Sequence, residues 1–302
     1  MIQKLFLNIV LSFLSLASYA QIAKTSLPSY VEGTCIVDRN DPFEPDVRMK
    51  EGPLKGMCVN PLARRSVKIL SAEETKPYFS LKTGNIVIAN FSHEQKFWVA
   101  QIPIDQVQQL KIQIQYFAVV KVPRIEIAHT QFLFEFKEGA EILLTPQVRP
   151  AKSSEIVKLK KMIFSVENIG PYGEAFDGLK GLKGHYKLAY RAVSLADKYQ
   201  WMVKEVKSLV EQERIDLRPD QVRAVLNEAL TRGDQWSTNR DYHTIKPNCV
   251  SELFSILDKV LVIKGLPLPF VPNFAPQALW FRGILDTQTA LPSLNESYDG
   301  VP

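Results

Sequence analysis

The chain has 302 residues, of which 46% are hydrophobic and 23% are charged, a composition typical of a globular protein. A chain of this length can bury a sizeable core, as one large domain or as two small ones. The formal net charge of +5 is too small to indicate a nucleic-acid-binding protein, and it fits an anionic or a neutral partner equally well.

The first twenty residues have the pattern of a secretory signal peptide. Lys4 precedes an apolar run from Leu5 to about Leu16, and small residues at Ser18 and Ala20 mark a cleavage site after Ala20. The run is too short to span a bilayer, although a retained helical anchor is the alternative reading. No later stretch is apolar enough to span one. We therefore expect an exported chain, cleaved near Ala20, without a transmembrane segment in its mature form.

Residues 21–62 contain five prolines and little periodicity, which indicates an extended N-terminal segment. Cys35 and Cys58 both lie in it, and a disulfide between them would remove about 3 kcal/mol of unfolded-state entropy. Pairing of Cys249 with Cys35 or with Cys58 is the alternative. The favoured pairing leaves Cys249 as a free thiol in an exported protein, which requires an explanation.

From Val67 to Thr145 the pattern is typical of strands. Turn residues around Gly139 predict a hairpin between the last two of these strands. The expected strands are 85–90, 97–102, 110–114, 124–127, 132–136 and 141–145.

Residues 150–190 are mixed in pattern, and glycines recur evenly among lysines from Gly178 to Gly184. The spacing of a phosphate-binding loop is missing. The run indicates either a mobile surface loop or a flexible lid over a site.

The remainder is predicted to be helical up to about Ile263. One helix is expected from Leu195 to about Glu213, and a second opens at Pro219 and ends near Gly233. Four prolines between 267 and 276 then predict an extended, irregular C-terminal stretch.

Cys249 lies where a loop becomes an amphipathic helix, since apolar residues follow it at helical spacing. Asn248 is a good N-cap, and Pro247 disfavours helix before it. The free N–H groups and the dipole of a helix start favour a thiolate and can hold an oxyanion. Cys249 is therefore a candidate nucleophile. A packing role is the alternative, because free cysteines are often buried.

A thiolate nucleophile needs a base, usually histidine, and the chain has four. His129 ranks first because it is a polar residue within an aromatic strand. His243 ranks second, although an ordinary loop side chain is its expected role. His93 is expected in an exposed turn, and His185 follows the glycine run.

Two short motifs carry a resemblance to a known family. His129-Thr130 opens the aromatic strand 132–136 and precedes the turn at Gly139, and Tyr242 stands shortly before Asn248-Cys249 and its helix. In this order and separation they resemble the Lnb N-terminal periplasmic domain family, which are exported bacterial proteins of the permuted NlpC/P60, papain-like kind. The tyrosines at 186–190 and the Pro-rich end near Pro269 are also similar, so the resemblance covers roughly residues 60–285.

The resemblance implies a His129–Cys249 dyad in a cleft between sheet and helix. Where the family tends to have an acidic residue before "xR", this chain has Gln147 and then Arg149. Gln147 could orient the imidazole by a hydrogen bond but without a carboxylate's charge, which weakens the case for full activity. Arg149 could bind a substrate carboxylate, or pair structurally. Tyr242 and Asn248 complete the expected substrate-binding set.

The expected fold is α+β, an antiparallel sheet packed against helices with a circularly permuted papain-like core. The expected divisions are a signal peptide (1–20), the disulfide-tied segment (21–62), the papain-like domain (63–285) and a tail (286–302). No metal or cofactor motif is present, so no cofactor is expected.

Three functions are compatible with these expectations. The first is an exported cysteine hydrolase or acyltransferase that acts on amide or ester bonds of a cell-envelope component, such as a peptidoglycan peptide, a lipid or an envelope protein. The second is a non-catalytic binding or assembly domain of the envelope that retains the fold. The third is a purely structural periplasmic domain. The protein would be periplasmic or secreted in each case.

Overall fold

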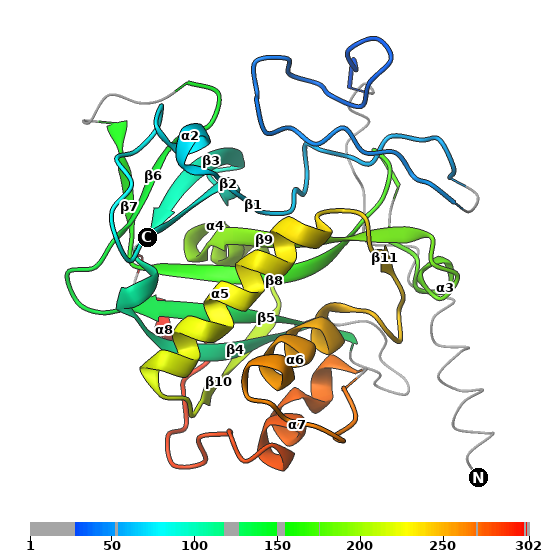
Figure 1. Cartoon of the computed structure of the whole chain (residues 1–302). Helices are drawn as coiled ribbons and strands as arrows, with labels where there is room; N and C mark the ends of the chain where they lie inside the picture. The colour runs from blue at the N-terminus through cyan, green and yellow to red at the C-terminus, as the bar shows by residue number, and fades with distance from the viewer. Residues whose placement is uncertain are drawn as a thin grey trace.

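The structure, a computed structural model, describes residues 28–51, 54–117, 127–149, 155–174, 176–269, 271–298 and 300. The expected signal peptide, with its cleavage site at Ala20, lies outside these residues, as does most of the expected strand 124–127. Among the described residues, eleven strands form one sheet with helices on both of its faces (Figure 1).

The strands of this sheet differ greatly in length. The longest lie at its centre, and the shortest are two-residue strands at its margins. Their bounds are β1 (Lys68–Ile69), β2 (Ile86–His93), β3 (Lys96–Ile102), β4 (Val107–Phe117), β5 (Ile127–Phe136), β6 (Ile142–Pro146), β7 (Val157–Leu159), β8 (Lys161–Ile169), β9 (Tyr186–Ser194), β10 (Leu209–Ile215) and β11 (Asp241–Tyr242).

The described helices are mostly short, apart from α5 and α6. The α-helices are α2 (Ala72–Thr75), α3 (Gly178–Gly181), α4 (Leu195–Tyr199), α5 (Pro219–Trp236), α6 (Cys249–Val260), α7 (Ala275–Phe281) and α8 (Leu294–Ser297). Three further segments are the 3-10 helices η2 (Ile104–Gln106) and η5 (Pro272–Phe274) and the π-helical η4 (Gln200–Glu205).

The sheet follows the order β10-β4-β5-β8-β9-β2-β3-β6-β7, with β1 beside β2 and β11 beside β9. All described pairs are antiparallel except β2 with β9, which are parallel at Ser92 and Val193. The fold is therefore α+β with a mixed sheet, and the expectation of a purely antiparallel sheet is corrected. The predicted hairpin is also wrong, because β6 pairs with β3 and β7, whereas β5 pairs with β4 and β8.

Strand β5 runs through the middle of the sheet and divides the core. Along a strand, successive side chains point to opposite faces. Phe132 and Phe134 accordingly belong to the large apolar core under α5 and α6, whereas Leu133 belongs to a smaller core with Leu195 and Met202. We call the face covered by α5 and α6 the front face and the face covered by α4 and η4 the back face (Figure 1).

The front helices form where the sequence predicts them. Helix α5 begins at Pro219, buries its apolar stripe (Val222, Val225, Leu226, Ala229, Leu230) completely and runs three residues beyond Gly233. Helix α6 begins at Cys249 and buries Val250, Leu253 and Phe254 against the same core.

The back face departs from the prediction of one long helix from Leu195 to Glu213. The helix ends after η4, where Lys207 adopts a φ of 56°, and the chain returns as strand β10. Burial alternates along 209–212 and the alternation then breaks, with Val210 and Ile215 covered on opposite faces of the sheet. The apolar residues Leu209, Val210 and Ile215 do not alternate in the sequence, so pairing with β4 decides that this segment is a strand.

The N-terminal segment contains the Cys35–Cys58 disulfide, which confirms the favoured pairing, and Cys249 is a free, buried thiol. The glycine run is not a loop throughout. It forms the short helix α3, capped by the Asp177 side chain. The C-terminal stretch is also less irregular than expected, because 275–281 form α7.

Candidate functional site

Cys249 is the first residue of α6, as predicted, and Asn248 is its N-cap. The Asn248 Oδ1 accepts a hydrogen bond from the Ser251 N–H at 3.0 Å, and the Ser251 hydroxyl accepts one from the Asn248 N–H at 2.9 Å. The Asn248 Nδ2 donates to the carbonyls of Thr244 and Ile245. Asn248 is buried, and its contacts hold the loop and the start of the helix in place.

The Cys249 thiol is enclosed on the front face, with 9% of the residue exposed. The N–H and hydroxyl of Thr130 and the N–H groups of Val250 and Cys249 itself act on the sulfur and favour its charge. Burial outweighs them, because a thiolate loses its hydration when it is enclosed, and the pKa of Cys249 is raised. The expectation of a lowered thiol pKa is therefore wrong.

Thr130 is the residue of β5 that faces Cys249. Its hydroxyl is fully buried and has no other hydrogen-bond partner among the described residues. The sulfur thus lies against a strand residue that can donate a hydrogen bond but cannot accept a proton as a base.

His129, one residue earlier on β5, points to the back face. Its Nε2 lies 2.8 Å from the Ser165 Oγ, and Ser165 follows Phe164 of the front core on β8. Burial and the nearby positive charge of Lys198 lower the pKa of His129 to about 3, so the imidazole is neutral at physiological pH. Because adjacent strand residues face opposite ways, the sheet separates His129 from Cys249. The predicted dyad is not assembled.

His129 borders a buried ionic cluster built around Glu167 of β8. The Glu167 Oε2 pairs with Arg64 Nε at 2.9 Å and with Arg191 NH1 at 2.8 Å, and its Oε1 pairs with Lys198 Nζ at 2.6 Å. We call these four residues the Glu167 cluster. It contains three cations and one carboxylate.

The pKa shifts of the Glu167 cluster follow from this arrangement. The pKa of Glu167 lies well below its usual range, because the neighbouring cations outweigh the burial that opposes its ionisation. Burial lowers the pKa of Lys198 to about 8, even though Glu167 acts in the opposite direction. Such shifts occur at functional sites and also in structural ion-pair networks.

Gln147 lies just beyond the end of β6, away from both predicted catalytic residues. Its Nε2 donates to Asp41 Oδ1 at 2.7 Å and to Asn90 Oδ1 at 3.0 Å, and its Oε1 accepts from the Asn90 N–H at 2.7 Å. Gln147 is 1% exposed, and its contacts join the N-terminal segment to β2. It does not orient His129. Arg149 is exposed in the following bend.

Tyr242 is the predicted binding residue that the structure brings to Cys249. The pKa of its phenol is raised, first by burial and then by the nearby Cys249 thiol. Phe176 packs on Tyr242 with ring centroids 5.7 Å apart. Helix α3 packs against the loop that holds Thr244, since a Cβ on Gly181 would meet the Thr244 hydroxyl. The glycine run therefore packs against the loop that leads to Cys249.

The other three histidines contact neighbouring backbone or side-chain groups, and none of these contacts is with Cys249. The His243 Nδ1 accepts hydrogen bonds from the N–H groups of Ile245 and Lys246, in agreement with its expected loop role. His93 is buried at the end of β2, with its Nδ1 3.0 Å from Ser194 Oγ, so the expected exposed turn is wrong. The His185 Nε2 lies 3.5 Å from Glu174.

The Glu167 cluster was missed by sequence reasoning. Ser165 and Glu167 alternate with apolar residues on β8, and Arg191 stands in the apolar run of β9. Charged residues inside otherwise apolar strands are the signal that could have indicated a buried polar site. Among the described residues, no group of three or more His, Cys, Asp or Glu side chains could hold a metal ion.

The fold and the site define an α+β domain with a free cysteine at the start of a helix that packs on the sheet. The model of the family described as Lnb N-terminal periplasmic domain matches residues 95–272, more than half of the chain. The chain belongs to this family, as its motifs suggested. Comparison with curated proteins gives no match, and neither does comparison with solved structures. None of the described helices is both long and apolar enough to cross a bilayer.

Proposed function

We propose that this protein is a non-catalytic binding or assembly domain of the bacterial cell envelope. In this proposal it is exported, retains a circularly permuted, papain-like core of the NlpC/P60 kind, and engages an envelope component without cleaving it. Membership of a periplasmic domain family supports the location. The alternative of a cysteine hydrolase or acyltransferase requires a thiolate and a base at one place.

The observation that carries the proposal is the placement of His129 and Cys249 on opposite faces of β5. His129 is hydrogen-bonded to Ser165 on the back face, while Cys249 contacts Thr130 on the front face. A nucleophile and its base need to be within hydrogen-bond reach, and catalytic pairs are looser only by small rearrangements. A rotation of the side chain about its own bonds does not carry His129 through a sheet.

One observation favours the hydrolase as the second candidate. Cys249 has N–H donors from Val250, from its own backbone and from Thr130 around its sulfur. Such a set of donors could hold the oxyanion of a tetrahedral intermediate. In that case the Cys249 sulfur would attack a carbonyl and form a thioester, the amine or alcohol would leave with the thiol proton, and water or another acceptor would then take the acyl group.

Product analysis separates the two functions. The wild-type protein and Cys249→Ala would be incubated with peptidoglycan fragments, phospholipid vesicles and envelope proteins, and each mixture would be analysed by mass spectrometry. We expect no new product from either protein and equal retention of the bound fraction. Products formed by the wild type and absent with Cys249→Ala would overturn the proposal in favour of the hydrolase.

A further inference from the structure

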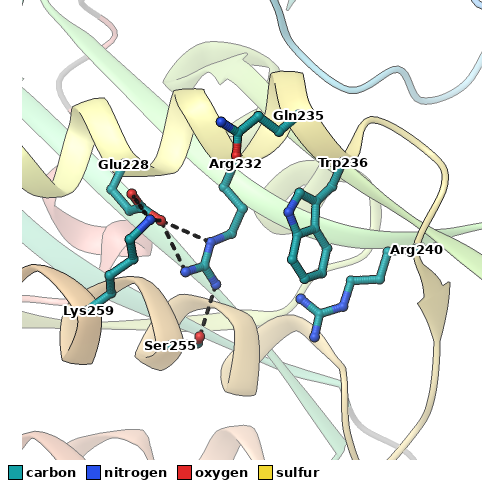
Figure 2. Close-up of a pocket in the computed structure, with 7 residues that line it drawn as sticks. All are labelled: Glu228, Arg232, Gln235, Trp236, Arg240, Ser255 and Lys259. Carbon is teal, nitrogen blue, oxygen red and sulfur yellow. Dashed lines mark hydrogen bonds and ion pairs between the residues drawn. The ribbon is translucent and has the colours of Figure 1, made fainter.

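We infer that a small basic pocket between α5 and α6 binds the free carboxylate of a peptide. This inference rests on the proposed binding function and names the chemistry of the ligand. The pocket has a volume of about 190 Å³. Its lining residues come from α5, from α6 and from the loop before β11: Glu228, Arg232, Gln235, Trp236, Arg240, Ser255 and Lys259 (Figure 2).

Arg232 is fixed as one wall of the pocket. Its Nε and NH2 donate to the Glu228 carboxylate at 3.3 and 3.1 Å, and its NH1 donates to the Ser255 hydroxyl at 2.9 Å. Lys259 Nζ reaches the same Glu228 carboxylate at 2.8 Å from the rim, where its side chain is 64% exposed. The pocket therefore already holds one carboxylate between a guanidinium and an ammonium group.

Arg240 offers a second guanidinium on the opposite side. Its Cζ lies 3.8 Å from the centre of the Trp236 ring, and its NH1 donates to Glu252 Oε2 at 2.6 Å. A guanidinium has five N–H donors, and stacking on an aromatic ring pre-organises it for a planar anion. The side chain remains 28% exposed. Figure 2 shows Arg232 and Arg240 facing the space between the helices from two sides.

The charges favour a single carboxylate. The three cations Arg232, Arg240 and Lys259 face the carboxylates of Glu228 and Glu252, which leaves one positive charge in excess. A monoanion balances this excess, whereas a phosphate dianion would reverse it. The pocket is also smaller than the roughly 300 Å³ at which small-molecule sites begin, so it suits one terminal group rather than a whole ligand.

The pocket is connected to the Cys249 helix through Glu252, one turn further along α6. The Tyr190 hydroxyl donates to Glu252 Oε2 at 2.9 Å, and Arg240 pairs with the same oxygen. A ligand bound to Arg240 would thus lie on the front face of the domain and would not have to contact the buried Cys249 thiol. Peptides with free carboxylates are a component of the cell wall, which makes them candidates for this site.

Titration with a peptide acid and its amide tests the inference. N-acetyl-alanyl-alanine would be compared with its C-terminal amide and with glycerol phosphate, while the Trp236 indole signal is followed by NMR. We expect the acid to bind at least about tenfold more tightly than the amide, because only the acid forms charge-assisted hydrogen bonds to the guanidinium. Glycerol phosphate should bind more weakly than the acid.

Variants show whether the effect belongs to this pocket. Arg240→Gln should remove the preference for the acid, and Lys259→Gln should weaken acid binding severalfold at low salt. Lys259 is exposed, so this variant keeps the fold, and an unchanged near-ultraviolet circular dichroism spectrum would confirm it. Lys264→Gln, an exposed lysine outside the pocket, is the matched control and should bind like the wild type.

The inference fails if the acid and the amide bind equally, if glycerol phosphate binds best, or if Lys259→Gln binds as the wild type does. Those outcomes would leave the absence of a Cys249-dependent product untouched. Conversely, a Cys249-dependent product would overturn the proposed function even if the acid binds here. The two failures are therefore distinguishable.

Discussion

His129 and Thr130 are neighbours in sequence but belong to two chemically different faces of the same strand. On the front face, Thr130 meets the Cys249 thiol, whose pKa is raised by burial. On the back face, His129 adjoins Ser165 and the Glu167 cluster, where charges are paired at 2.6–2.9 Å. Burial keeps the Cys249 thiol neutral on the front face and the His129 imidazole neutral on the back face, whereas the neighbouring cations keep Glu167 ionised.

This difference shows that a motif can be present in sequence while its parts are divided in space. A strand alternates with a period of two, so a shift of one residue exchanges the faces. His129 and Thr130 are adjacent, so their side chains point to opposite faces of the sheet. The register of β5 decides which of the two contacts α6. Here Thr130 pairs with Ile114 of β4 and faces α6.

The largest expected effect comes from breaking the charge balance of the back face. Glu167→Gln leaves Arg64, Arg191 and Lys198 without their shared carboxylate, and the loss of one partner from a buried ionic group costs about 3–5 kcal/mol. Urea unfolding followed by circular dichroism should show this loss. Glu73→Gln, which breaks the exposed pair with Lys76, is the control and should change the unfolding free energy little. Equal effects of the two changes would show that the Glu167 cluster is not structural.

The next effect is a dependence of stability on pH that belongs to the back face. The pKa of folded His129 is about 3, below its ordinary value of 6.5, so the unfolded chain binds more protons between these values. The contribution of neutral His129 to the free energy of unfolding should therefore be complete above pH 6.5, and it should be lost as the pH is lowered toward 3. The lowered pKa of Glu167 acts in the same direction below its ordinary range near pH 4.5.

His129→Gln isolates the contribution of the imidazole. Between pH 7 and pH 4 this variant should lose less stability than the wild type, by on the order of 3 kcal/mol. Urea unfolding at pH 7, 5.5 and 4 measures the difference. Identical pH profiles for the two proteins would mean that His129 titrates normally and is not enclosed.

A smaller effect is expected at the start of α6 on the front face. Asn248→Ala removes the side-chain acceptor for the Ser251 N–H and both contacts to the preceding loop, and the loss of an N-cap costs about 1 kcal/mol. Thermal unfolding should detect it. Ser71→Ala at the exposed cap of α2 is the control and should cost less, because α2 buries one residue only. A loss of several kcal/mol would make the front face as dependent on polar contacts as the back face.

Local features were predicted correctly where the residue pattern is compatible with a single local structure. The Asn248 cap, the buried stripe of α5 and the Cys35–Cys58 disulfide follow from local preferences, and each is present. The predicted hairpin failed because strand pairing between β6 and β3 is decided by distant parts of the chain. The helical reading of β10 failed because pairing with β4 overrides local preference.

The candidate site shows the same limit. Motif order indicated that the β5 segment and the α6 segment meet, and they do, through Thr130 and Cys249. Which of two adjacent side chains faces the helix depends on the strand register and could not be read from spacing. The burial that raises the pKa of Cys249 depends on surrounding elements, among them Tyr242, rather than on the helix start alone.

The rate of Cys249 alkylation as a function of pH tests the separation of His129 from Cys249 most directly. Iodoacetamide labelling of the folded protein would be measured from pH 6 to pH 10 in the wild type and in His129→Gln. Our account predicts slow labelling at neutral pH, a rise only above the ordinary thiol range, and the same profile in both proteins. Rapid labelling near pH 7 that drops tenfold or so in His129→Gln would show a working Cys–His pair and contradict the account.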